Sequence, residues 1–232
     1  MDGNVFNFAN FKKNTIDASF LLHFWDWDSY QALKHNLYAL LGNQVVRIRT
    51  DAQPNFVEYV RTPKFEIKPI GDGSPDAKFT IQFENPSGYK YNLNTTDQLA
   101  DIWDDYPLGY NIGIQEAADY TFTTSSFQIC NIGDVKIDPY YKNHDMQIII
   151  HFKGNSLTVT NSSNGDSWTY NTAATKSDTI ILDGINTFRN GASDSKSTDF
   201  GNISLERGFN NIYVSGSSDF DITFSFRGLY LD

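Results

Sequence analysis

Histidine, cysteine and the common hydrolase motifs give little support for catalysis or metal binding. Cys130 is the only cysteine, which excludes an intrachain disulfide and a cysteine-based zinc site. The G-x-S-x-G sequence that would place a nucleophilic serine is absent, and GDGSP at 71–75 lacks the lysine of a phosphate-binding loop. The sequence therefore predicts no cofactor and no metal. Four histidines are scattered without H-x-x-x-H or H-x-H spacing: His23, His35, His144 and His151.

Carboxylates are the second kind of residue that could do chemistry, because glycoside hydrolysis needs only two of them on opposite sides of a sugar bond. With 28 acidic residues in the chain, composition alone does not select such a pair. Two local clusters could suggest calcium, but neither has the alternating oxygen ligands of an EF-hand loop. We interpret both as solvated polar surface. The clusters are Asp101 with Asp104 and Asp105, and Asp194 with Asp199.

Aromatic residues near turns form the one binding signal of the chain. Trp168 and Tyr170 follow the NSSNGDS turn, and an exposed aromatic ring beside polar side chains can hold a sugar. The two residues are candidate glycan contacts. The competing interpretation is that alternate aromatics of the WTY strand are simply core.

Net charge and composition limit the kinds of partner that this chain can bind. The chain of 232 residues has 28 acidic and 18 basic residues, a formal charge of -10. An acidic protein without a basic cluster cannot release counterions from a phosphate backbone, so we expect no nucleic-acid binding, and an anionic membrane would repel it. The first residues lack the pattern of a signal peptide, and no apolar run approaches the roughly 20 residues of a membrane span. Folding in a reducing cytoplasm is the expectation.

One helix is predicted, over residues 28–42. Asp28 is the expected N-cap and Gln31 completes a capping box, while leucines recur at helical spacing up to Gly42, where a left-handed C-cap is favoured. A shorter helix is predicted over 97–104.

Elsewhere the hydrophobic period is two, which predicts strands with one wet and one dry face. We place a domain boundary near 110–120, between a helix-containing domain at 1–118 and an antiparallel β-sandwich at 119–232. The fold class is therefore mainly β. Predicted strands lie at 45–50, 56–61, 65–70, 78–84 and 222–227.

Three ordered motifs resemble those of the distal tail (Dit) proteins of long-tailed bacteriophages, the siphophages. The stretch KFTIQFENPSGYKYNL (78–93), preceded by FEIKPIG, resembles the end of that family's N-terminal belt domain. The segments WTYNTAATKSDTIILDGINTF (168–188), GNISLERGFNNIYVSG (201–216) and DITFSFRGLYL (221–231) resemble its C-terminal elements. Their order is a strand, a D-G turn, an L-x-x-G-x-N turn and a closing strand.

The resemblance implies a mechanical role. Belt domains of six copies would form a hexameric ring at the end of the tail tube, and galectin-like C-terminal sandwiches would hold tail-associated, receptor-binding or baseplate proteins. The protein would belong to the virion, at the tail tip, after assembly in the bacterial cytoplasm. Family members carry additional strands before the region that begins at Phe24, so the belt domain is expected to be incomplete at its N-terminus.

The surfaces through which ring subunits contact one another contain apolar or aromatic residues that a monomeric protein would bury in its own core. The dense segment 20–30 is the candidate ring interface; the alternative is that it only packs the helix that follows. Two other functions stay open: a carbohydrate-binding module for host cell-wall saccharide, which rests on Trp168 and Tyr170, and a wall-degrading hydrolase, which rests on acid content alone. The interface candidates are Phe20, Phe24, Trp25 and Trp27.

Overall fold

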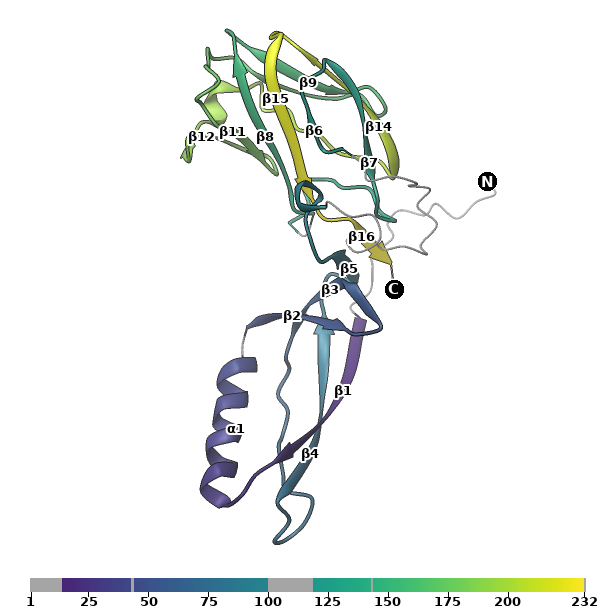
Figure 1. Ribbon diagram of the computed structural model, residues 1–232, viewed down its shortest axis with the longest axis vertical. Coiled ribbons are helices and arrows are strands. Elements are labelled where there is room, and N and C mark those ends of the chain that lie inside the picture. The colour runs from purple at the N-terminus through teal and green to yellow at the C-terminus, as the bar shows by residue number, and fades with distance from the viewer. Residues whose placement is uncertain (1–13, 43, 100–118, 143, 232) are drawn as a thin grey trace, which may run out of the picture. The chain divides into compact units, whose positions relative to one another are not determined.

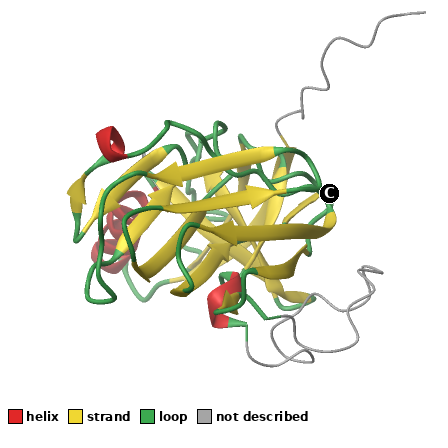
Figure 2. Ribbon diagram, turned by 90° about the horizontal axis from the view of Figure 1, so that it is seen from above, coloured by secondary structure: helices red, strands yellow, loops and turns green. Residues whose placement is uncertain are grey.

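The computed structural model describes residues 14–42, 44–99, 119–142 and 144–231. Contacts divide the chain into two compact units: a first unit of residues 1–51 and 57–90, and a second of residues 52–56 and 91–231. Strands make up most of the described chain (Figures 1 and 2). The only α-helix among the described residues has 15 residues, and no described helix is long and apolar enough to cross a membrane.

The first unit packs one helix against an antiparallel sheet with the strand order β1-β4-β3, in which β2 also pairs with β3. Strand β1 pairs with β4 along its whole length, from Asn14 opposite Asn85 to His23 opposite Asp76. Strands β3 and β5 each contribute residues to both units. The elements are β1 (Asn14–His23), α1 (Trp27–Leu41), β2 (Val45–Thr50), β3 (Gln53–Arg61), β4 (Asp76–Asn85) and β5 (Tyr89–Asn92).

Strand β4 shows why the sequence forms this sheet. Its apolar residues alternate with polar ones, and the apolar set faces α1 and is buried, as a period of two predicts. The helix adds Tyr30, which is buried, and Leu33 and Leu37, which pack on the same cluster. The core residues are Phe24, Tyr30, Val60, Ile67, Ala77, Phe79, Ile81 and Phe83.

The N-cap of the helix lies two residues earlier than predicted. Asp26, not Asp28, is the N-cap, because its extended backbone lets its carboxylate accept the backbone N–H of Ser29. Asp28 then lies in the first turn, where its negative charge interacts favourably with the positive end of the helix dipole. The predicted left-handed cap at Gly42 was also wrong: φ is -73°, and glycine is needed because a Cβ would lie 2.5 Å from the Tyr38 carbonyl oxygen.

The predicted strand at 65–70 is not formed; this stretch makes only one isolated bridge, Pro69 to Ala77. Its backbone carbonyls bond to helix side chains instead of to a neighbouring strand. The Tyr30 hydroxyl donates to the Ile67 carbonyl oxygen at 2.7 Å, and the Tyr38 hydroxyl donates to that of Phe65 at 3.2 Å. The alternation of apolar residues was real, but helix tyrosines took the place of a partner strand.

The Asn85-Pro86-Ser87-Gly88 turn is held by one buried side chain. The Asn85 Oδ1 accepts the backbone N–H groups of Ser87 and Gly88, both at 3.1 Å, and its Nδ2 donates to the Tyr89 carbonyl at 2.9 Å. Gly88 has φ of +69°, in the left-handed region. This local network explains why the N-P-S-G sequence ends a strand and reverses the chain.

Gly88→Ala should lower the free energy of unfolding of the first unit by about 1–2 kcal/mol, because an L side chain is strained at this φ. Urea unfolding followed by circular dichroism measures it. The matched control is Gly71→Ala, where φ is ordinary and an added Cβ meets nothing within 4 Å, so a change within about 0.5 kcal/mol is expected. Equal effects of the two substitutions would contradict the prediction.

The second unit is a two-layer sandwich with a four-stranded sheet, β10-β9-β14-β7, and a six-stranded sheet, β13-β12-β11-β8-β15-β6. Aromatic rings from the two sheets meet in its core: Phe152 is 6.1 Å from Tyr170, and Phe127 is 6.2 Å from Phe224, between ring centroids. The elements are η1 (Thr96–Gln98), β6 (Thr121–Phe122), β7 (Ser126–Asn131), β8 (Met146–Lys153), β9 (Leu157–Asn161), β10 (Asp166–Tyr170), β11 (Ile180–Asp183), β12 (Asn186–Arg189), β13 (Ala192–Ser193), η2 (Ser195–Ser197), β14 (Gly208–Ser215), β15 (Asp219–Phe226) and β16 (Leu229–Leu231).

Residues 91–99 pack with the second unit. The Thr96 hydroxyl donates to the Phe224 carbonyl at 2.7 Å, and the Asn92 Oδ1 accepts the Gly228 backbone N–H at 3.0 Å. Of the helix predicted over 97–104, only the short η1 turn is seen, and residues 100–104 lie outside the described residues. The predicted domain boundary at 118/119 borders the same undescribed segment and stays a prediction.

Candidate functional site

The connection between β1 and α1 is rigidly built, and two tryptophans flank its centre. The Asp26 carboxylate accepts the Ser29 backbone N–H at 2.7 Å, and the Asp26 backbone N–H donates to the Ser29 hydroxyl at 3.0 Å. The backbone and side-chain hydrogen bonds from Ser29 also hold the pKa of Asp26 below its ordinary value. This capping box fixes the directions in which Trp25 and Trp27 leave the backbone.

The structure separates the four candidate interface residues. Trp25 and Trp27 are 88% and 62% exposed, whereas Phe24 is 5% exposed and packs on Tyr30 with ring centroids 4.9 Å apart. Phe20 is intermediate: it stacks on Phe79, yet 39% of it is exposed. Phe24 therefore packs against the helix, as the alternative proposed, while the two tryptophans face solvent and stay candidate interface residues.

A hollow of about 570 Å³ lies beside the exposed tryptophans. Trp25 and Trp27 form one side of it, and the turn at 68–75 contributes residues from Lys68 to Pro75. Leu21, on the outward side of β1, is 68% exposed. We call Trp25, Trp27 and the residues of this turn that line the hollow the tryptophan surface.

The chemistry of the tryptophan surface favours association with protein. Large exposed aromatic residues beside a few charged groups resemble the centre and rim of a protein–protein interface. Asp26, Lys68 and Asp72 supply charged groups around the hollow. Isolated exposed apolar residues need no explanation, whereas Trp25 and Trp27 line the same hollow, so the tryptophan surface is a candidate interaction site.

The candidate glycan contacts do not reach solvent. Trp168 is 1% exposed and Tyr170 is fully buried. The Tyr170 hydroxyl donates to Asp194 at 2.5 Å, and burial together with this bond raises the pKa of Tyr170. Neither ring can stack on a sugar in this structure, so their burial supports the alternative that they are core residues.

Two of the carboxylates considered for calcium accept hydrogen bonds from their own loop and from the neighbouring strand β10. Asp194 accepts hydrogen bonds from Tyr170 and Ser197, and Asp199 accepts the backbone N–H groups of Thr169 and Gly201. In the described part of the chain, no group of three or more His, Cys, Asp or Glu side chains is placed to hold a metal ion. The cluster of Asp101, Asp104 and Asp105 lies outside the described residues.

A histidine–aspartate pair spans two strands of the six-stranded sheet. His151 and Asp221 stand directly opposite each other on β8 and β15, with 2.7 Å between Nδ1 and Oδ1, and the His151 Nε2 is 3.2 Å from the Thr179 hydroxyl. Lys176 bonds the same carboxylate at 2.6 Å. Burial raises the pKa of Asp221, but the bonds from Lys176 and His151 outweigh it, so the pKa is lowered. Such opposed pairs stabilise strand pairing.

Several exposed apolar residues were not singled out from the sequence. Leu21 lies in the candidate segment 20–30 and could have been named, since one of the adjacent leucines 21 and 22 on a strand must face outward. Ile70 and Tyr213 are 62% and 52% exposed, and no sequence pattern indicates their exposure. Only the packing in the structure shows which side of each segment is covered by other residues.

Comparison with known proteins identifies the fold. The sequence matches no protein-family model and no curated protein. Among solved structures, the chain resembles the crystal structure of the SPP1 Dit (gp 19.1) protein, described as a paradigm of the hub adsorption apparatus in phages that infect Gram-positive bacteria. The TM-score is 0.66 at 15% identity, over 100% of this chain and 84% of that chain. The predicted β-rich fold of a phage distal tail protein is thereby confirmed.

Proposed function

We propose that this chain is a structural, non-enzymatic component of a bacteriophage tail tip or baseplate. Copies of it would form a ring that links the tail tube to tail-associated, receptor-binding or baseplate proteins during host attachment. The observation that carries the proposal is the likeness in fold to a phage hub protein along the whole chain, through both units rather than one.

The proposal assigns ring formation to residues 1–118 and partner docking to the galectin-like sandwich at 119–232. A ring needs a heterologous contact, in which one patch meets a different patch on the next copy and the rotation closes. The tryptophan surface supports this assignment, since Trp25 and Trp27 are exposed on a rigid connection rather than on a free loop. Six copies are the expected number, and the ring would be part of the virion.

Light scattering of the purified chain tests ring formation. We expect a mass of about six times the monomer mass of 26.3 kDa at micromolar concentration. Trp25→Ser combined with Trp27→Ser should give monomers, because most of both side chains is exposed in the free subunit. Trp27 also packs on Tyr30, with ring centroids 5.1 Å apart, so circular dichroism must show that the double variant is folded. Negative-stain images of the wild-type oligomer should show a closed ring.

The matched control is Tyr140→Ser, which removes an aromatic residue that is 66% exposed in the second unit and should leave the mass unchanged. Wild-type protein that stays monomeric up to about 100 µM would contradict ring formation by the chain alone. A ring that persists in the double variant would instead contradict the tryptophan surface as its contact.

A further inference from the structure

The outer face of the four-stranded sheet in the second unit differs from the rest of this acidic protein. Its outward residues form cross-strand rows of hydroxyl and amide side chains, and none of the residues in these described rows is charged. One row, across β7, β14, β9 and β10, is Ser126, Tyr213, Thr160 and Ser167. The rows beside it are Ser215, Thr158 and Thr169 on one side, and Gln128 and Asn211 on the other.

The contrast with the six-stranded sheet is informative. The outward positions of β8 and β15 include charged or titratable residues, Lys153, His151, Asp219 and Asp221, beside the uncharged Gln147, Ile149, Thr223 and Ser225. In a chain of net charge -10, the exposed face of a sheet would ordinarily include charged residues of this kind. The rows of the four-stranded face therefore offer neutral donors and acceptors, and the carboxylate of Asp199 lies at the edge beside Thr169, whose backbone N–H it accepts.

The polar side chains on this face are held in place by one another. Thr158 and Thr169 are joined by a 3.1 Å hydroxyl–hydroxyl bond, and the Gln128 side-chain amide donates to that of Asn211 at 2.9 Å. Hydroxyl and amide groups can donate and accept at once, which is what the hydroxyls of a sugar require of their partners. Because the rows are already ordered, a ligand would lose little entropy by fixing them.

Tyr213 supplies the apolar part of the surface. It is 52% exposed at the centre of its row, and its amphipathic ring offers a flat face and a polar edge. Phe209, four residues earlier on the same outward side of β14, is 59% exposed. The two rings are about 13 Å apart along the strand, a spacing that suits an extended ligand rather than a single small molecule.

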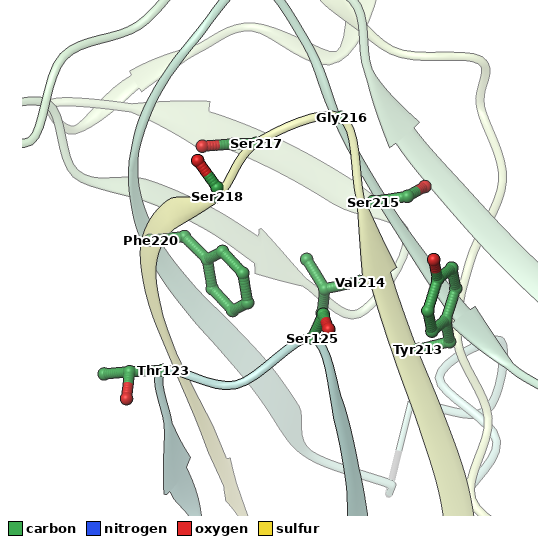
Figure 3. Close-up of a pocket in the computed structure, with 9 residues that line it drawn as sticks. All are labelled: Thr123, Ser125, Tyr213, Val214, Ser215, Gly216, Ser217, Ser218 and Phe220. Carbon is green, nitrogen blue, oxygen red and sulfur yellow. The ribbon is translucent and has the colours of Figure 1, made fainter.

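A pocket of about 540 Å³ begins at Tyr213 and Ser215 and continues around the end of β14. Figure 3 shows Tyr213 and Ser215 on one side of β14, with Ser217 and Ser218 on the turn that follows and Thr123 and Ser125 on the segment before β7. Its lining again carries no charge, and its volume lies within the range of small-ligand sites.

We propose that Tyr213 and the neutral rows on the outer face of β7, β14, β9 and β10 bind a neutral oligosaccharide. The Tyr213 ring stacks on the apolar face of a sugar unit, and the hydroxyl and amide side chains bond its hydroxyls. This site lies in the second unit, and it depends neither on the ring nor on Trp168 and Tyr170.

Saturation-transfer NMR and titration calorimetry on the full chain test the proposal. The probes are hexasaccharides of glucose, of galactose and of N-acetylglucosamine, with polygalacturonate as a charged comparator. Binding of a neutral probe with a dissociation constant of about 1 mM or tighter is expected, with magnetisation transferred to the C–H protons of the stacked sugar. Both measurements work on a monomer and on an assembled ring.

Tyr213→Ala should weaken this binding about tenfold, whereas Tyr213→Phe keeps the ring and should retain most of it. Thr160→Val removes a hydroxyl at constant shape and should weaken it several-fold. Tyr140→Ala is the control with an exposed aromatic residue away from the site, and its affinity should match the wild type. The proposal is overturned if none of the neutral probes binds at about 10 mM, if polygalacturonate binds more tightly, or if Tyr213→Ala binds as well as the wild type.

Discussion

Trp168→Ala should lower the free energy of unfolding of the second unit by about 3–5 kcal/mol. The indole is 1% exposed and stacks beside Tyr170, with ring centroids 6.2 Å apart. Truncation removes its apolar area and leaves a cavity that the two packed sheets cannot fully close. Urea unfolding monitored by circular dichroism gives the difference.

Trp168→Phe should cost less than half as much. The Trp168 Nε1 has no hydrogen-bond partner among the described residues, so phenylalanine removes a buried donor that costs about 1–3 kcal/mol when left unpaired. Removing this unpaired donor offsets part of the free-energy cost of the smaller cavity that phenylalanine leaves. Tyr140→Ala is the control in the same unit, because this ring is 66% exposed and its loss should change stability by no more than about 0.5 kcal/mol. If alanine at 168 were as harmless as alanine at 140, Trp168 would not be a core residue.

Asn210→Ala should lower the free energy of unfolding of the second unit by about 3 kcal/mol, since several buried groups lose their partners together. The Asn210 Oδ1 accepts the Glu206 backbone N–H at 2.8 Å, and its Nδ2 donates to the carbonyls of Glu206 and Gly208. Asn161 also donates to Asn210, and both residues are fully buried. Thermal and urea unfolding would both report the loss.

Two further variants separate the causes. Asn210→Asp keeps the shape but replaces the donor with a buried carboxylate that faces two carbonyl oxygens, so at neutral pH it should be at least as destabilising as alanine. Asn211→Ala is the matched control one residue along β14, where the side chain faces outward, and a change of about 0.5 kcal/mol is expected. If the variants at 210 and 211 proved equally stable, the buried network would not be what holds this turn.

These turns show how much of the fold could be predicted from sequence. The L-x-x-G-x-N motif works through Asn210 and through Gly208, whose φ is +81°, and the D-G turn works through Gly184, whose φ of +60° suits the first position of a two-residue hairpin loop. Most partners in these turns lie within a few residues along the chain, although Asn161 also donates to Asn210 from a distant strand. Asn85 likewise bonds mainly within its own turn and also donates to Glu58. These local bonds explain why short motifs identified the fold at 15% identity to its solved relative.

The candidate site was predicted less well. The sequence singled out aromatic residues in two places, 20–30 and 168–170, without distinguishing those that face solvent from those in the core. In the structure Trp25 is exposed and Trp168 is buried, although each stands one residue from another large aromatic side chain. Tyr213, which carries the proposed saccharide site, attracted no attention, because its strand alternates as any half-buried strand does.

The amino-acid sequence by itself determined the local structure: the period of the strands, the caps and turns closed by nearby side chains, and the single α-helix seen among the described residues. Only the tertiary structure decided which aromatic rings meet solvent, which carbonyls of residues 65–67 bond to helix tyrosines, and which sheet face stays neutral and open. The physical reason is the range of the interactions. A turn is satisfied by neighbours in sequence, whereas burial depends on what packs against a residue from distant parts of the chain.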